Sequence, residues 1–140
     1  LLHALEASGL FAKVVGLSRS STPALDLLDE QSIQACAQKV QAHGLALRLV
    51  MDATGFLHNS TWSPEKSWQQ LDPAHMAHSF AVNAIGPALL MKHLLPLLPR
   101  EGKSVFATLS AKVGSIGDNR LGGWYSYRAS KAALPRLLSP

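Results

Sequence analysis

Cysteine is almost absent from this sequence of 140 residues, and Cys36 is its only thiol. A single cysteine excludes an internal disulfide and the paired-cysteine spacing of structural zinc sites. His75 and His78 share a predicted helix, but no cysteine or carboxylate stands beside them at ligand spacing, so no metal site is predicted. Such sparing use of cysteine is typical of a reducing compartment, which predicts a cytoplasmic location.

Charged residues are also few, at 16%, and long apolar runs are missing. The 13 Lys+Arg and 9 Asp+Glu give a net charge of +4, but the basic residues are scattered singly. Without a basic run interleaved with aromatic residues, a nucleic-acid partner is not expected. The longest apolar stretch, around residues 84–98, is broken by prolines, a glycine, a lysine and a histidine. With no basic and apolar leader at residue 1, the sequence predicts neither a membrane span nor a targeting segment.

Short apolar runs alternate with longer amphipathic segments along the chain. The runs that predict buried strands are residues 12–17, 24–28, 45–53 and 105–109. The segments with helical spacing are residues 1–8, 32–43, 73–98 and 125 onward, with a further helix start at Ser63-Pro64. Strands that alternate with helices of this length indicate an α/β fold, in which helices cover both faces of a parallel sheet.

Polar or glycine-containing segments follow each predicted strand. They are Ser18-Arg19, residues 26–29, residues 52–55, and the loop with Ser110 and Ser115. Because ligands bind outside the carboxyl ends of parallel strands, these segments predict one binding crevice.

Tyr127 and Lys131 form the sharpest chemical pattern in the sequence. Residues four apart lie on one face of a helix, so the Lys131 ammonium can approach the Tyr127 phenol. A phenol is a poor base near neutral pH, and a nearby cation favours its ionised form. The pair is therefore a candidate general acid and base for an alcohol oxygen. The alternative is a surface tyrosine packed along a lysine stem.

Asn83 is a second candidate because Pro87 lies four residues after it. Proline has no N–H to donate to the carbonyl four residues earlier, so the Asn83 main-chain carbonyl is left free and a kink is expected. A freed carbonyl of this kind can hold a water molecule. The alternative is a proline kink without a functional role.

Three segments together resemble the short-chain dehydrogenase/reductase family. They are Asn-Ala-Ile-Gly-Pro at 83–87, Leu-Ser-Ala-Lys-Val-Gly-Ser at 109–115 and Tyr-Arg-Ala-Ser-Lys-Ala-Ala-Leu at 127–134. Within the family, the chain most resembles the branch of C-factor-like proteins and sniffer-type carbonyl reductases, whose long loop before the tyrosine matches residues 117–124. The resemblance implies a Rossmann-like, doubly wound parallel sheet.

The resemblance also implies catalytic roles. Tyr127 is expected to donate the proton to a carbonyl during hydride transfer, while Lys131 assists it and hydrogen-bonds the nicotinamide ribose. The Asn83 carbonyl is expected to hold a water that links Lys131 to solvent. The family's substrate-orienting serine falls on Ala111, so Ser110 is expected to supply that hydroxyl, with Ser115 as the alternative.

Further residues match the family's cofactor-binding positions. The turn Asp52-Ala53-Thr54-Gly55 stands where the family usually has Asn-Asn-Ala-Gly and passes close to the cofactor. Asp26 and Leu27 match the position that brackets the adenine. Ser18-Arg19, with no carboxylate beside it, favours NADP over NAD because an arginine accommodates a 2′-phosphate.

The expected protein is an NADP-dependent oxidoreductase that acts on a small carbonyl or alcohol. A non-catalytic, nucleotide-binding regulatory protein on the same scaffold is the alternative. Trp124 could line the substrate pocket or pin its loop. The apolar helices 73–98 and 125 onward predict a homodimer or homotetramer.

The sequence contains no glycine-rich phosphate-binding turn of the Gly-x-Gly-x-x-Gly or Gly-x-x-x-Gly-x-Gly type. Residues 1–140 are therefore expected to be one partial domain, an internal fragment without the first strand and the last strands of the sheet. Alone, this piece is expected neither to fold cooperatively nor to bind NADPH.

Overall fold

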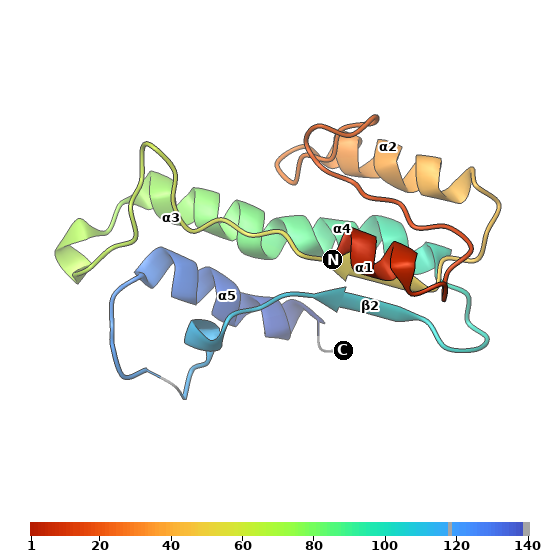
Figure 1. The fold of residues 1–140 in the computed structure, drawn as a ribbon. Helices are drawn as coiled ribbons and strands as arrows, with labels where there is room; N and C mark the ends of the chain where they lie inside the picture. The colour runs from red at the N-terminus through yellow and green to blue at the C-terminus, as the bar shows by residue number, and fades with distance from the viewer. Residues whose placement is uncertain (118, 139–140) are drawn as a thin grey trace.

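The computed structural model describes all residues except 118 and 139–140 (Figure 1). The α-helices are α1 (Leu2–Ala7), α2 (Glu30–Gln41), α3 (Pro73–Phe80), α4 (Gly86–Leu94) and α5 (Tyr125–Leu138). The strands are β1 (Leu49–Asp52) and β2 (Val105–Thr108). Short helical turns fill in between: η1 (Trp68–Gln70), η2 (Ala81–Ile85), η3 (Leu95–Leu97) and η4 (Lys112–Gly114).

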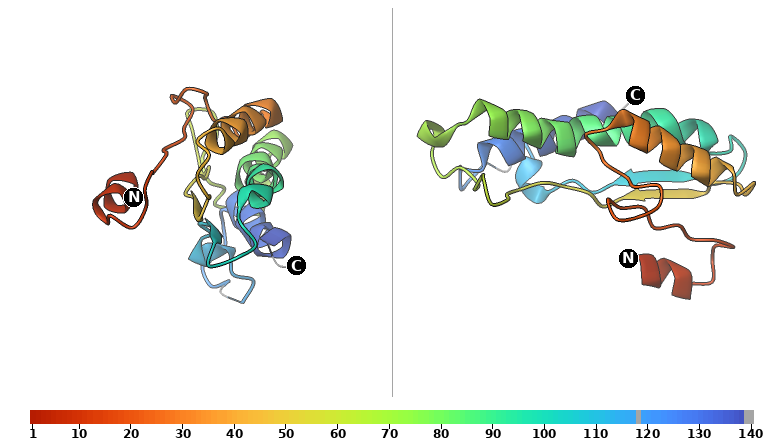
Figure 2. Two further views of the ribbon diagram at one scale, coloured as in Figure 1. Left: turned by 90° about the vertical axis from the view of Figure 1, so that its right-hand side faces the viewer. Right: turned by 90° about the horizontal axis from the view of Figure 1, so that it is seen from above.

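β1 and β2 form a parallel pair, in register from Leu49 opposite Val105 to Asp52 opposite Thr108. Helices α2, α4 and α5 lie together on one side of this pair, and the short α1 lies beyond the other side (Figure 2). This is a partial α/β layer structure, consistent with an incomplete Rossmann fold. Parallel strands need a crossover connection, and the segment from α3 to η3 provides it between β1 and β2.

Two of the predicted strands are wrong. Residues 12–17 form no strand, and residues 24–28 lead through a turn into α2. A strand forms only when a neighbour takes up its backbone hydrogen bonds, and β1 and β2 are the only strands among the described residues. Within 24–28, Leu27 is buried at 8% exposure and Leu25 packs against the core, whereas Leu28 is 55% exposed.

The predicted helix start at Ser63-Pro64 is also wrong. Asn59 instead closes a turn, in which its side-chain oxygen accepts from the backbone N–H groups of Thr61 and Trp62. The chain then runs past Pro64 as a loop until η1.

The start at Asp72-Pro73 is confirmed. The Asp72 carboxylate accepts from the His75 N–H at 2.7 Å, and Pro73 occupies the first turn of α3. The helix widens into the π-turn η2 one turn before Pro87, where the proline cannot donate the usual hydrogen bond. The defect expected around Asn83 and Pro87 is therefore present.

The continuous helical segment Pro73–Leu97 contains an 18-residue window with a mean hydropathy of 1.3. By length and composition alone, this segment could cross a membrane. However, its interior side carries the buried polar side chains of His75, Ser79 and Asn83, where it packs against α5. The same pattern suits the central helix of a layered α/β domain, and the expected absence of a membrane partner stays a prediction.

The apolar core lies between α2, α4 and the sheet. Its buried members are Leu27, Ile33, Ala37, Leu90 and Leu94. Gly86 lets the chain at residue 27 approach α4, because a Cβ at Gly86 would lie 2.8 Å from the Leu27 Cβ.

Candidate active site

Helix α5 carries Tyr127 and Lys131 one turn apart. The Lys131 side chain is buried, at 3% exposure, and its Nζ donates to the Leu109 carbonyl oxygen at 2.9 Å. Burial lowers the pKa of this ammonium from its ordinary 10.5, and the negative charge of Asp52 partly opposes that shift. The structure thus holds the Lys131 ammonium inside the protein, beside the residue that follows β2.

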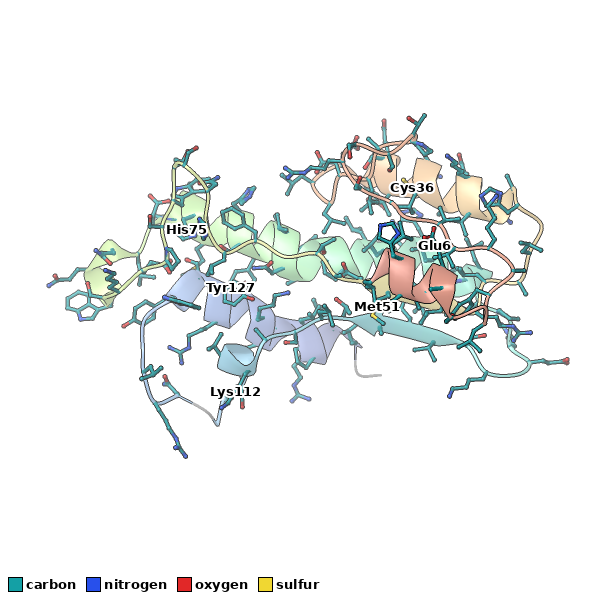
Figure 3. The ribbon with its side chains drawn as sticks, viewed as in Figure 1. Glu6, Cys36, Met51, His75, Lys112 and Tyr127 are labelled. Atoms are coloured by element: carbon teal, nitrogen blue, oxygen red, sulfur yellow. The ribbon has the colours of Figure 1, made fainter. Side chains whose placement is uncertain are left out.

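Tyr127 is half-buried near the N-terminal end of α5, below α3 (Figure 3). The ring of Trp124 meets the Tyr127 ring edge to face, with the ring centroids 6.3 Å apart. Trp124 itself is 41% exposed and has a φ of 50°. The indole therefore contacts the expected catalytic tyrosine while keeping one side open to solvent.

Asn83 is fully buried and connects three segments. Its side-chain oxygen accepts from the Phe56 N–H at 2.7 Å, and its amide nitrogen donates to the Phe56 carbonyl at 2.8 Å. The same nitrogen donates to the Ser130 hydroxyl at 3.0 Å, and that hydroxyl donates to the Tyr127 carbonyl. This role of the Asn83 side chain was not evident from the sequence, which pointed only to the main-chain carbonyl. The water at that carbonyl stays a prediction.

The turn after β1, residues 52–55, passes beside Asn83 and Lys131. The Asp52 carboxylate accepts from the Thr54 N–H and hydroxyl, and its other oxygen accepts from the Thr108 hydroxyl at 2.6 Å. These bonds join the turn to the end of β2. A Cβ at Gly55 would lie 3.5 Å from the Lys131 Nζ and 3.7 Å from the Asn83 side-chain oxygen, so the turn approaches both groups closely.

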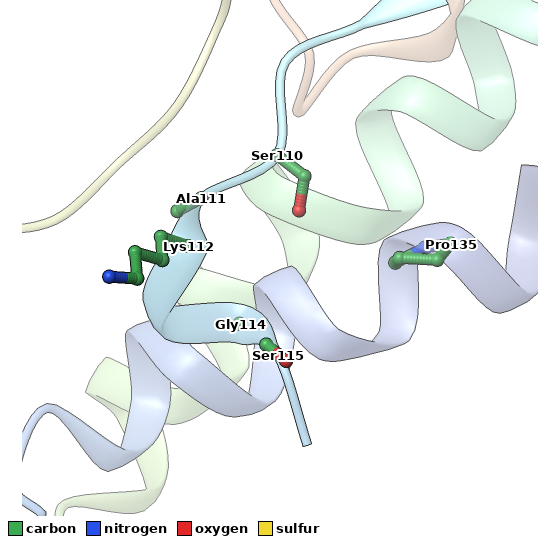
Figure 4. A pocket seen from close by; sticks show the side chains of 6 residues that line it. All are labelled: Ser110, Ala111, Lys112, Gly114, Ser115 and Pro135. Atoms are coloured by element: carbon green, nitrogen blue, oxygen red, sulfur yellow. The ribbon is translucent and has the colours of Figure 1, made fainter. Parts of the chain in front are cut away.

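Ser110 and Ser115 line one cavity of about 480 Å³ together with Ala111, Lys112, Gly114 and Pro135 (Figure 4). The Ser110 hydroxyl donates to the Lys131 carbonyl oxygen at 3.4 Å. Gly114 packs on the same turn of α5, because a Cβ there would lie 2.9 Å from the Lys131 Cβ. The structure therefore brings both candidate serines to one cavity and links Ser110 to the main chain of Lys131. The choice between them stays a prediction.

The expected adenine-end residues lie on two connected loops. The Leu25 N–H donates to the Ser18 carbonyl at 2.8 Å, which joins the Ser18-Arg19 turn to the segment that precedes α2. Asp26 is half-buried and accepts from the Leu28 N–H at 2.9 Å, while Arg19 is exposed. Leu27 is buried in the core, so its side chain offers no surface to a ligand.

A further buried cluster was not expected from the sequence. Glu65, His75 and Ser126 are each at most 3% exposed, and they meet at the start of α5. Sixty-one positions separate Glu65 from Ser126, and no short pattern signals such a contact.

A short-chain dehydrogenase model described as "Enoyl-(Acyl carrier protein) reductase" matches residues 6–138 of this chain. The chain belongs to the short-chain dehydrogenase/reductase family. Within this family it is 34% identical over 111 residues to 1-hydroxy-2-glutathionyl-2-methyl-3-butene dehydrogenase of Rhodococcus sp. strain AD45, with 79% of this chain and 46% of that protein covered. It is 41% identical over 64 residues to C-signal of Myxococcus xanthus, with 46% of this chain and 39% of that protein covered.

A solved structure of the family has a similar fold. The NADPH-bound carbonyl reductase from chicken fatty liver superposes with a TM-score of 0.70 and 29% identity over 81% of this chain and 48% of that one. This short-chain dehydrogenase/reductase chain spans less than half the length of the two curated relatives named above. The predicted Rossmann-like fold and family are confirmed.

Proposed function

We propose that this short-chain dehydrogenase/reductase chain carries the proton-transfer machinery of an NADP-dependent oxidoreductase that acts on a small carbonyl or alcohol. NADP, when bound, exchanges a hydride with the substrate carbon. The supporting observation is the buried Lys131 ammonium, which lies one turn from Tyr127 and close to Gly55 of the turn after β1. Burying the Lys131 ammonium costs stability. This cost favours a functional role for Lys131 over the alternative, a surface tyrosine packed along a lysine stem.

The side chains of the site divide the work of moving a proton. The Tyr127 phenol donates its proton to the carbonyl oxygen in reduction and takes one from the alcohol in oxidation. The Lys131 ammonium stabilises negative charge on the phenol oxygen as the proton leaves. The Ser110 hydroxyl donates to the oxygen of the substrate and stabilises the charge that develops there.

The residues present fit NADP at both of its ends. At the nicotinamide end, Gly55 lies close to Lys131, and Asn83 fixes the turn that contains this glycine through its bonds to Phe56. At the adenine end, the half-buried Asp26 and the exposed Arg19 belong to connected loops. An arginine there complements a 2′-phosphate, and the chicken carbonyl reductase is a relative that binds NADPH.

A non-catalytic, nucleotide-binding regulatory protein is the second candidate. Its support is the 41% identity to C-signal over 64 residues and the presence of Ala111 at the family's serine position. A panel of ketones and aldehydes separates the two candidates when NADPH oxidation is followed with the intact protein, meaning this chain with whatever segments accompany it in the cell. Turnover of any panel member supports the oxidoreductase. Tight binding of NADPH without turnover across the panel supports the regulatory protein.

The helices that flank the site also support the expected assembly. Exposed apolar side chains remain on them, with Ile85 at 53%, Leu95 at 41% and Leu137 at 44% exposure. A homodimer or homotetramer would cover such side chains in the intact protein. Its size in solution, from sedimentation, tests this part of the proposal.

A further inference from the structure

Helix α5 starts without a local cap. Gly122, Gly123 and Trp124 precede it with φ values of 65°, 65° and 50°. The Trp124 carbonyl accepts the first helical hydrogen bond, from the Arg128 N–H, so Trp124 holds the position where serine or aspartate usually caps a helix. An indole cannot accept from the free N–H groups of the first turn. Those groups need acceptors from elsewhere in the chain.

Glu65 supplies these acceptors from a distant loop. Both of its carboxylate oxygens lie 3.3 Å from the Ser126 backbone nitrogen, and the Ser126 hydroxyl donates to the same carboxylate. The Glu65 backbone carbonyl accepts from the Trp124 N–H. A Cβ at Gly123 would lie 3.0 Å from that carbonyl oxygen, which favours glycine in this place. Glu65 thus holds two residues that stand just before Tyr127, namely Trp124 and Ser126.

The Glu65 carboxylate is more deeply buried than a cap requires. It is 2% exposed, and taking a carboxylate out of water is costly unless partners compensate. The Ser126 donors at the positive end of the α5 dipole are one set of partners. The other is His75 of α3, whose Nδ1 lies 3.4 Å from the carboxylate and whose ring stacks on Trp62 at 5.6 Å between centroids. Glu65 therefore links its loop to both α3 and α5, at the end of the helix pair where Figure 3 labels His75 and Tyr127.

We propose that Glu65 is a positioning residue for catalysis, which holds the first turn of α5 so that the Tyr127 phenol meets the substrate oxygen. The inference rests on the proposed role of Tyr127. Tyr127 directly follows Ser126 in the chain, and its ring contacts Trp124, so one residue that Glu65 holds adjoins the Tyr127 backbone and the other its ring. A displacement of about 1 Å in a catalytic group can slow a reaction about 100-fold.

The test compares two substitutions of Glu65 in the intact protein, with the exposed Glu101 as the matched control. Glu65→Ala is expected to lower kcat for carbonyl reduction by about 10-fold to 100-fold while the Kd for NADPH changes less than about twofold. Glu65→Gln keeps an oxygen that accepts from the Ser126 N–H, so it is expected to restore most of kcat. Glu101→Ala is expected to match the unmodified protein. Full kcat in Glu65→Ala, or a glutamine variant as slow as the alanine variant, overturns the inference.

A second arm separates this inference from the proposed function. In a Tyr127→Phe background, Glu65→Ala is expected to cause no further loss in kcat, because the group that Glu65 positions is gone. An equal loss in both backgrounds overturns the inference and leaves the role of Tyr127 intact. Full activity of Tyr127→Phe alone contradicts the proposed function instead. If Glu65→Ala does not fold, Ser126→Ala decides: reduced kcat at unchanged NADPH affinity supports the inference, and unchanged kcat overturns it.

Discussion

Ser79 and Ser130 should respond oppositely to the same substitution. Both serines are fully buried where α3 packs against α5. The Ser130 hydroxyl accepts from Asn83 and donates to the Tyr127 carbonyl, whereas the Ser79 hydroxyl has no hydrogen-bond partner among the described residues. Ser130→Ala therefore breaks a buried hydrogen-bond network, whereas Ser79→Ala removes a buried hydroxyl that has no hydrogen-bond partner within the described part of the chain.

The magnitudes follow from these contacts. Ser130→Ala leaves one donor of the buried Asn83 amide unpaired, which costs about 1–3 kcal/mol. Ser79→Ala removes the penalty of a buried hydroxyl without a partner, about 1–3 kcal/mol before any loss from the small void. Both changes gain about 0.5 kcal/mol of helix propensity, which cancels when the two variants are compared. The free energies of unfolding should therefore differ by about 2–6 kcal/mol, with Ser79→Ala the more stable.

Urea unfolding of the two variants in the intact protein measures this difference, provided that the m-values agree. Equal stabilities, or a Ser79→Ala variant less stable than Ser130→Ala, would refute the assignment of the hydrogen bonds at this interface.

Three further predictions concern the site itself. Arg19→Ala should reduce the ratio of NADPH to NADH affinity by about 10-fold or more, and an unchanged ratio in binding titrations would show that the arginine is only a solvated charge. Ser110→Ala should lower kcat about 10-fold to 100-fold, Ser115→Ala should lower it less, and the double variant should lose the most; normal turnover of the double variant would mean that both serines are misassigned. Burial lowers the pKa of Lys131 below 10.5, so between the lowered pKa and 10.5 the unfolded chain binds more protons and the folded state gains stability as the pH rises. The stability of Lys131→Met relative to the unmodified protein should accordingly decrease over that window, and a pH-independent difference in unfolding free energy would contradict this reasoning.

The local features of the fold could be predicted from the sequence because their causes are local. The Asp72-Pro73 start of α3 depends on a cap and a proline that stand next to each other. β1 and β2 lie within the apolar runs 45–53 and 105–109. The runs at 12–17 and 24–28 have the same character but no partner strand among the described residues, and pairing is not a property of one segment.

The contacts that organise the site escaped prediction because they join distant parts of the chain. The Asn83 amide binds Phe56, 27 positions earlier, and Glu65 binds Ser126, 61 positions later. Neither pair forms a pattern of short spacing that could be recognised without the fold. The Tyr127 and Lys131 pair could be recognised because helical geometry alone places residues four apart on one side.

The matched pair Tyr127→Phe and Tyr125→Phe tests the central claim most directly, since these are the two tyrosines of the chain and both lie in the first turn of α5. The measurement is kcat for NADPH-dependent reduction of a carbonyl substrate by the intact protein. Tyr127→Phe should lose about 100-fold or more, and Tyr125→Phe should stay within about threefold of the unmodified protein. Equal activities of the two variants would contradict the assignment of Tyr127 as the proton donor.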